Sequence, residues 1–290
     1  MHELREAVMA KVFFICACAS VFAILLICFF LFTGGIPAIG TIGPAEFFLG
    51  TDWRPVSDPP SFGILPMITG SILITFGAIV LGVPVGIFTA IFLAHMCPKQ
   101  LYVILKPVVN LLAGIPSVVY GFFGMIVLVP VIREISQRFT GGGTGMSMLT
   151  ASLLLGIMIL PVIIAISESA IRAIPDSYYE GALALGASHT RSIFFVVVPA
   201  AKSGILASVI LGIGRSVGET MAVVMVAGNQ PRMPVHLLRG ARSMTANIVM
   251  EMGYATGIHR DSLIATAVVL FFFILLINIT FTILSKRGEK

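Results

Sequence analysis

The chain has 290 residues, of which 58% are hydrophobic and 11% are charged, and its mean hydropathy is +1.05. Soluble domains carry about 25% charged residues, so this composition excludes an ordinary soluble protein and indicates an integral membrane protein. The net charge of +5 comes from basic residues scattered at the ends of apolar runs, without interleaved aromatic residues. Because nucleic-acid-binding surfaces gather basic residues in patches, we expect no binding to nucleic acid.

Six apolar runs are long enough to cross a bilayer, which takes about 20 residues of helix. They predict an all-α polytopic membrane protein with a single domain, residues 1–290, and spans at about residues 10–33, 66–94, 107–131, 148–171, 202–227 and 262–285. The first run is longer than the apolar core of a secretory signal, and no small-residue cleavage site directly follows it. We therefore interpret it as the first transmembrane helix.

The distribution of basic residues predicts the orientation in the membrane. Six spans place both termini on one side, and if that side is the cytoplasm, ten basic residues lie inside and seven outside, with every lysine inside. Cytoplasmic segments carry an excess of Lys and Arg, so we predict cytoplasmic termini. Segments 34–61, 132–147 and 228–261 then lie outside. The third is open to two interpretations, contact with an outer partner or a solvated loop, and we favour the loop slightly.

The loop between the fourth and fifth spans, residues 172–201, is one of the few long amphiphilic passages. Ser177 and Glu180 have the spacing of a capping box, which predicts a helix that starts near Tyr178. Gly186 suits a left-handed cap at its end, and Ser188 then opens a second helix that Pro199 stops or kinks. Spacing alone is equally consistent with an ordinary amphipathic connector.

Two charges lie inside the fifth span. Arg215 is twelve residues from both Ser203 and Ala227, roughly 18 Å from either end of the span. An arginine near the bilayer centre costs about 2.5–3.5 kcal/mol, which favours a functional role. Glu219 is four residues further on, so a continuous helix would place it on the same face.

Two interpretations of this pair remain open, and they are compatible with each other. Arg215 and Glu219 could form a buried ion pair that fixes helix packing. Alternatively, the guanidinium of Arg215 binds a passing tetrahedral oxyanion, while Glu219 holds the arginine when no substrate is present.

Other reactive residues indicate no enzyme site. Glu168 is expected to form an ion pair with Arg172 at the end of the fourth span. The sequence has no Ser/His/Asp or Cys/His arrangement, no paired catalytic carboxylates and no Walker A motif. We expect no catalytic residue, no metal site and no cofactor in this chain. The cysteines, which show no disulfide or metal spacing, are Cys16, Cys18, Cys28 and Cys97.

The passage EGALALGASHTRSIFFVVVP, residues 180–199, resembles the EAA loop of ABC-importer permeases. Glu180, Ala182, Gly186 and Pro199 keep the register of that loop, whereas Gly181 replaces its usual second residue, alanine. Three further stretches resemble the phosphate-specific PstC type of this family: FGILP at 62–66, AGIPSVVYGFFG at 113–124 and GRSVGETMAV at 214–223. The resemblance covers most of residues 62–225, with Ser216 at a position where alanine is more common.

The resemblance implies a type I ABC-importer fold, with six transmembrane helices and a cytoplasmic coupling helix, in the bacterial cytoplasmic membrane. It implies contact with the ATPase for Glu180, Gly181, Ala182 and Gly186. It implies a place in the translocation path for Arg215, Ser216, Glu219 and Thr220.

The resemblance also implies partners. ATP and Mg would be bound by a dimer of PstB-like ATPase subunits, a PstA-like sister permease would complete the path, and a PstS-like binding protein would deliver inorganic phosphate from outside.

Alternatives from other classes remain. A secondary anion transporter driven by an ion gradient would also use Arg215 and Glu219, although the Glu180 loop and the lack of a convincing inverted repeat disfavour it. A membrane scaffold or sensor leaves the charge pair poorly explained. Within the importer class, sulfate or molybdate could replace phosphate, because a guanidinium does not by itself select one oxyanion.

Overall fold

The computed structural model describes residues 2–287 and confirms an all-α polytopic architecture. Among these residues, five helical stretches are long and apolar enough to span a membrane: Val8–Ile42, Leu65–Met96, Ser117–Phe139, Met148–Arg172 and Gly257–Thr280. A sixth span results if His189–Ala200 and Lys202–Gly218, which meet at a 69° bend, are counted as one.

The first third of the chain begins with one long helix, α1 (His2–Ile42), followed by the short α2 (Pro44–Leu49). A two-residue antiparallel hairpin comes next, in which β1 (Trp53–Arg54) pairs with β2 (Ser61–Phe62). The remaining helices in this third are α3 (Leu65–Ile91), the π-helical η1 (Phe92–Met96) and α4 (Lys99–Gly114).

The middle of the chain contains α5 (Ser117–Phe123), η2 (Gly124–Leu128), α6 (Val129–Thr140) and α7 (Met148–Arg172). Two short helices follow, α8 (Asp176–Ala184) and α9 (His189–Ser192), and then η3 (Ile193–Val197) and α10 (Val198–Ala200). The last third has α11 (Lys202–Gly218), α12 (Met221–Val226), α13 (Met244–Glu251) and α14 (Gly257–Arg287).

Each of the three π-helical turns is followed two residues later by a proline: Pro98, Pro130 and Pro199. Proline lacks an N–H and its ring collides with the carbonyl four residues earlier. A widened turn relieves this conflict. Pro199 therefore bends the chain less than expected, and the sharp bend comes at Ala201, between α10 and α11.

The centre of the body is the packing of α7 against α3 and α11. Gly77, Gly82 and Gly86 on α3 lie directly against α7, where an added Cβ would come within 2.4–2.8 Å of its atoms. These glycines let the two helices approach closely, which is the usual role of small residues between membrane helices.

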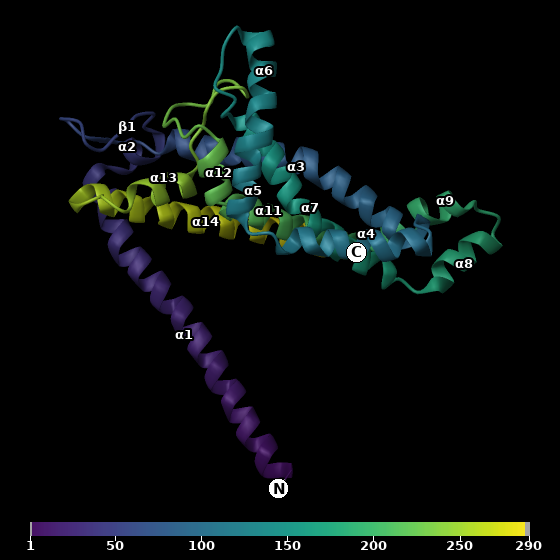
Figure 1. The fold of residues 1–290 in the computed structure, drawn as a ribbon. Helices are drawn as coiled ribbons and strands as arrows, with labels where there is room; N and C mark the ends of the chain where they lie inside the picture. The colour runs from purple at the N-terminus through teal and green to yellow at the C-terminus, as the bar shows by residue number, and fades with distance from the viewer. Residues whose placement is uncertain (1, 288–290) are drawn as a thin grey trace.

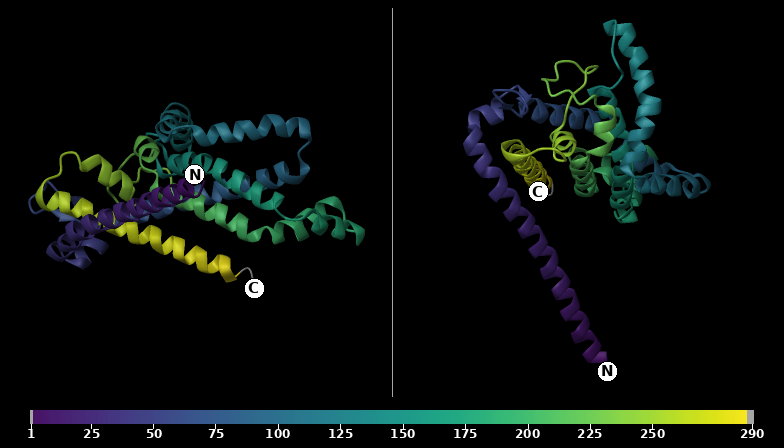
Figure 2. Two further views of the ribbon diagram at one scale, coloured as in Figure 1. Left: turned by 90° about the horizontal axis from the view of Figure 1, so that it is seen from below. Right: turned by 60° about the vertical axis from the view of Figure 1, so that its left-hand side comes forward.

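The body has two distinct ends. Figures 1 and 2 show α13 and the β hairpin at one end and α8 with α9 at the other. We call these the α13 end and the knob end, the knob being residues 176–192. The C-terminal part of α1 packs on the body near the α13 end, where Phe32 contacts Phe271 and Phe272 of α14. The N-terminal part of α1 diverges from the other helices.

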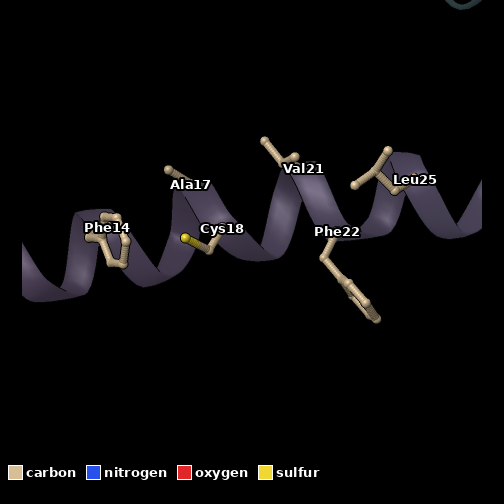
Figure 3. Close-up of a pocket in the computed structure, with 6 residues that line it drawn as sticks. All are labelled: Phe14, Ala17, Cys18, Val21, Phe22 and Leu25. Atoms are coloured by element: carbon tan, nitrogen blue, oxygen red, sulfur yellow. The ribbon is translucent and has the colours of Figure 1, made fainter.

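The diverging part of α1 is apolar and uncovered. Six of its side chains line a shallow apolar hollow and all come from this one helix (Figure 3): Phe14, Ala17, Cys18, Val21, Phe22 and Leu25. Such a surface suits lipid or another membrane helix.

Several span boundaries differ from the prediction. The third span does not run from 107 to 131, because the backbone is extended at Ile115 and Pro116 and separates α4 from α5. The residue before a proline disfavours the helical conformation, which explains the break. The span continues to Thr140 and ends at Gly141, whose φ of +71° provides a left-handed cap, so most of segment 132–147 is helix.

The expectation of a solvated loop at 228–261 holds for residues 230–239, which are non-helical and mostly exposed, but it is wrong for much of the rest of the segment. Part of this segment is α13, in which Met244, Ala246 and Asn247 are completely buried. Its backbone is anchored to α3, because the Met244 N–H donates to the Ser71 hydroxyl at 2.9 Å. Residues 240–251 are thus an integral layer of the α13 end.

Candidate functional site

The fifth span is broken at the residues expected to line the path. Helix α11 ends at Gly218, Glu219 is extended with φ −69° and ψ 131°, and α12 begins at Met221. The prediction that Glu219 shares a helix face with Arg215 is therefore wrong, and no ion pair joins the two among the described residues. In the sequence, Gly218 was the residue that could have indicated this break, since glycine is unfavourable inside a helix.

Glu219 has a local role at this break. Its Oε1 accepts the backbone N–H of Ala222 at 3.2 Å and so satisfies one free donor at the start of α12. The Thr220 hydroxyl donates to the Gly218 carbonyl at 3.2 Å and stabilises the same turn. Both side chains are half-buried, which leaves them accessible from one side.

Arg215 lies on the last turn of α11, immediately before the break, and is also half-buried. Within residues 2–287 it makes no hydrogen bond or ion pair. Charged groups inside membrane proteins usually pair or line a functional pathway. A guanidinium without a protein partner is able to receive an anion.

Ser216 differs from its neighbours because it turns into the body. It is 3% exposed, and its hydroxyl has no partner among the described residues. The break thus brings Arg215, Glu219 and Thr220 to a partly open surface and places Ser216 behind it.

The knob has the predicted bend but not the predicted start. Helix α8 begins at Asp176 after Pro175, and no side chain caps it, so the capping box of Ser177 and Glu180 is not formed. Proline pre-sets a helical φ and starts the helix earlier than the S-x-x-E spacing suggests. At the other end of the knob, Ser188 caps α9 as predicted, accepting from the Arg191 N–H at 3.4 Å.

Gly186 ends α8 in the predicted left-handed conformation, with φ +86°. The Gly186 N–H donates to the Leu183 carbonyl at 2.9 Å, and the Ala187 N–H donates to the Ala182 carbonyl at 3.1 Å. This pair of bonds is the Schellman motif, which satisfies two free carbonyls at the helix end.

Replacing Gly186 with alanine is expected to loosen the knob. A Cβ at Gly186 meets open space, so its cost is backbone strain alone, about 1–2 kcal/mol for a left-handed L residue. Gly181→Ala is the matched control, because Gly181 also faces open space but lies inside α8, where alanine gains about 0.8–1 kcal/mol over glycine. Hydrogen exchange of the α8 amides should quicken in the first variant and slow in the second; the same direction in both would contradict this view of the bend.

The surface of the knob is exposed, and its interior is braced. Glu180 is exposed, as is Leu185, whose exposed fraction is 91%. The Tyr179 hydroxyl contacts His189 Nδ1 at 2.5 Å and joins α8 to α9. A rigid projection with an acidic group and exposed apolar side chains is typical of a docking element.

A buried carboxylate lies where the knob joins the body. Glu168 is 1% exposed and forms the predicted ion pair with Arg172, at 3.0 Å from Nε to Oε1. It also contacts two α4 side chains that the sequence interpretation missed: Lys106 Nζ at 2.6 Å and the Tyr102 hydroxyl at 2.8 Å. That hydrogen bond, together with burial, raises the pKa of Tyr102, so its phenol stays protonated and donates.

Glu168→Gln is expected to lower the stability of the knob end. Removing one member of a buried charge cluster typically costs about 3–5 kcal/mol, because the remaining charges lose their compensation. We expect a loss of stability near the lower limit of this range, since Arg172 is half-exposed and keeps its hydrogen bond to the Leu93 carbonyl at 2.7 Å. Thermal unfolding in detergent measures the effect, and Glu134→Gln on the exposed face of α6 is the control; equal melting temperatures for both variants would contradict it.

The described residues offer no obvious metal site. No group of three or more His, Cys, Asp or Glu side chains within residues 2–287 is arranged to hold a metal ion.

Comparisons with known proteins agree on one family. Residues 82–290 match the family described as "Binding-protein-dependent transport system inner membrane component". The chain is 38% identical over 271 residues to the probable ABC transporter permease protein YqgH of Bacillus subtilis, covering 91% of this chain and 86% of the relative. It is 35% identical over 257 residues to the phosphate transport system permease protein PstC of Mesorhizobium japonicum, covering 83% and 78% of the two chains.

The fold is also shared with a solved structure. The chain resembles the inward-facing MetNI methionine ABC transporter with a TM-score of 0.62 and 19% identity, over 78% of this chain and 96% of that chain. The family match and the permease relatives show that the chain is a multi-pass transport subunit, whose kinds of partner are an ATPase and a substrate-binding protein. The chain belongs to the binding-protein-dependent inner-membrane components, the permease subunits of ABC importers.

Proposed function

We propose that this chain is a permease subunit of an ATP-driven importer of inorganic phosphate. The observation that carries the proposal is Arg215, a membrane-embedded guanidinium at a helix break that makes no hydrogen bond or ion pair within residues 2–287. Its planar fork of donors matches the oxygens of a tetrahedral oxyanion. Relatives named as phosphate permeases support phosphate as that oxyanion.

The residues at the break have different roles in the passage of an anion. Arg215 attracts phosphate and offers bidentate hydrogen bonds. The carboxylate of Glu219 lies next to the same opening and weakens retention by like-charge repulsion, so the anion does not stay bound. Thr220 offers a neutral hydroxyl, and Ser216 provides a second hydroxyl behind Arg215.

The knob transmits the energy of ATP hydrolysis. Glu180 and the exposed apolar side chains of α8 dock on a PstB-like ATPase subunit, with Gly181, Ala182 and Gly186 shaping the docking helix. ATP and Mg are bound by those subunits, because this chain lacks the glycine-lysine motif that cradles phosphates. The knob end and both termini then face the cytoplasm, and the α13 end faces outward.

Two further partners complete the transporter. A PstA-like sister permease covers the apolar surfaces that this chain leaves exposed, including α1 and the α5 residues Val118 and Val119. A PstS-like binding protein delivers phosphate to the α13 end.

Competition experiments test the choice of substrate. Uptake of labelled phosphate in cells whose phosphate route includes this chain should fall with excess unlabelled phosphate and persist with excess sulfate or molybdate. Stronger competition by either of those anions would overturn phosphate as the substrate while leaving the importer assignment intact.

A further inference from the structure

A buried polar cluster occupies the α13 end, centred on Glu251 at the end of α13. Glu251 is 6% exposed, and its carboxylate contacts Arg242 Nη1 at 2.6 Å, His259 Nε2 at 2.8 Å and Trp53 Nε1 at 2.9 Å. The β hairpin, which is distant in the sequence, and two nearby segments, the loop before α13 and the start of α14, therefore meet on one side chain of α13. We call Trp53, Arg242, Glu251 and His259 the Glu251 cluster.

Arg242 extends the cluster toward α12. Its Nε donates to the Asn229 carbonyl at 3.0 Å, and its Nη1 donates to Asn247 Oδ1 at 2.9 Å. Asn229 in turn donates from Nδ2 to the Val224 carbonyl at 2.6 Å, on α12. The carboxylate of Glu251 is thus connected through two residues to the helix that follows the break.

A second connection reaches the break itself. The Thr245 hydroxyl, on the first turn of α13, donates to the backbone carbonyl of Glu219 at 3.1 Å. Ser243 fixes that turn by accepting the Ala246 N–H at 3.1 Å. Helix α13 is therefore held at its end by Glu251 and is bonded at its beginning to the extended residue that carries the path carboxylate.

Packing alone would not require this arrangement. A buried carboxylate is costly to desolvate and stabilises a fold only when it is fully paired, and apolar residues of similar size often do as well or better. A charged cluster does, however, specify one arrangement of its four segments, since any shift leaves a buried charge unpaired. Such a cluster suits a helix such as α13 if the helix must hold one defined position and if its contacts must also break and form again during transport.

We propose that Glu251 is a positioning residue of the transport path, which fixes α13 over the Glu219 break and keeps the outer end of the path closed until the binding protein docks. The proposal deepens the proposed function and rests on it for the assignment of the α13 end to the outside. Loss of the Glu251 charge removes the ion pair that holds the end of α13 to Arg242 and His259, so α13 loosens over the break and the outer end opens without the binding protein.

Thiol accessibility tests this role. In the assembled transporter with Cys16, Cys18, Cys28 and Cys97 replaced by serine, Ala246→Cys places one thiol on α13 at a completely buried position. A membrane-impermeant thiol reagent added outside should label it slowly. Adding Glu251→Gln should raise the labelling rate about tenfold in the absence of the binding protein, because labelling follows the open population. It should also raise ATP hydrolysis without the binding protein.

Matched variants separate positioning from general damage. Glu251→Asp, which keeps the charge, should restore part of the slow labelling, and Glu46→Gln on exposed α2 should change nothing. Ala151→Cys reports on the buried face of α7 and should stay unlabelled in every variant. Unchanged labelling of Ala246→Cys in Glu251→Gln, or equal labelling of Ala151→Cys, would overturn the proposal.

Two milder variants cover the case in which Glu251→Gln does not assemble. His259→Gln and Trp53→Phe each alter one contact of the carboxylate and should each raise the labelling of Ala246→Cys. Slow labelling in both would overturn the proposal. This readout does not depend on the transported anion, so failure of phosphate uptake in the unmodified transporter would refute the proposed substrate separately.

Discussion

Arg215→Gln should lower phosphate uptake about 10- to 100-fold, because a hydrogen bond to a charged group contributes about 1.5–3 kcal/mol. The folded chain should be little affected, since Arg215 makes no hydrogen bond or ion pair with the described residues. Arg215→Lys keeps the charge but loses the planar fork, so we expect its uptake to lie between that of the unmodified transporter and that of Arg215→Gln. Initial rates of labelled-phosphate uptake, normalised to the amount of assembled transporter, provide the measurement.

The control for Arg215 is an arginine of the same charge outside the path. Arg232→Gln, in the exposed segment before α13, should leave uptake unchanged. If Arg215→Gln instead abolished assembly with the sister permease, the alternative that Arg215 fixes helix packing would be favoured.

Glu180→Lys should uncouple the transporter. Uptake should fall at least about tenfold, because reversing a charge at an interface replaces an attraction with a repulsion worth several kcal/mol. Glu180 is exposed and makes no hydrogen bond or ion pair within residues 2–287, so the isolated chain should fold normally. ATP hydrolysis stimulated by the phosphate-loaded binding protein is the direct measurement, and it should be lost together with uptake.

Glu46→Lys is the control for this charge reversal, because Glu46 is an exposed acid on α2, at the opposite end of the body from the knob (Figure 1). It should leave coupling intact. Normal ATP-driven uptake in the Glu180 variant would remove the knob from the coupling role.

The membrane architecture could be predicted because it depends on composition averaged over about 20 residues. Local sequence patterns also predicted the structure correctly where the outcome depends on a few neighbouring residues. Gly186 marked a left-handed turn, Ser188 marked a helix start, and the spacing of Glu168 and Arg172 marked an ion pair. The predicted capping box at Ser177 did not form, because α8 begins one residue earlier, at Asp176, directly after Pro175.

The break at Glu219 could not be seen in the same way. Hydropathy reports which residues tolerate lipid and says nothing about the continuity of the backbone, so residues 202–227 counted as one span. The tertiary bonds that hold the broken backbone come from Thr245 and, through Asn229, from Arg242. Likewise, Trp53 and Glu251 are 198 residues apart, and no local pattern announces their contact.

The energy source of uptake tests the central claim most directly. Labelled-phosphate uptake should be measured in cells whose only phosphate route includes this chain, once with a protonophore while ATP is maintained and once with ATP depleted while the ion gradient is maintained. An ATP-driven permease predicts loss of uptake on ATP depletion and continued uptake with the protonophore. Loss with the protonophore alone would contradict it and would make Arg215 and Glu219 the centre of a gradient-driven carrier.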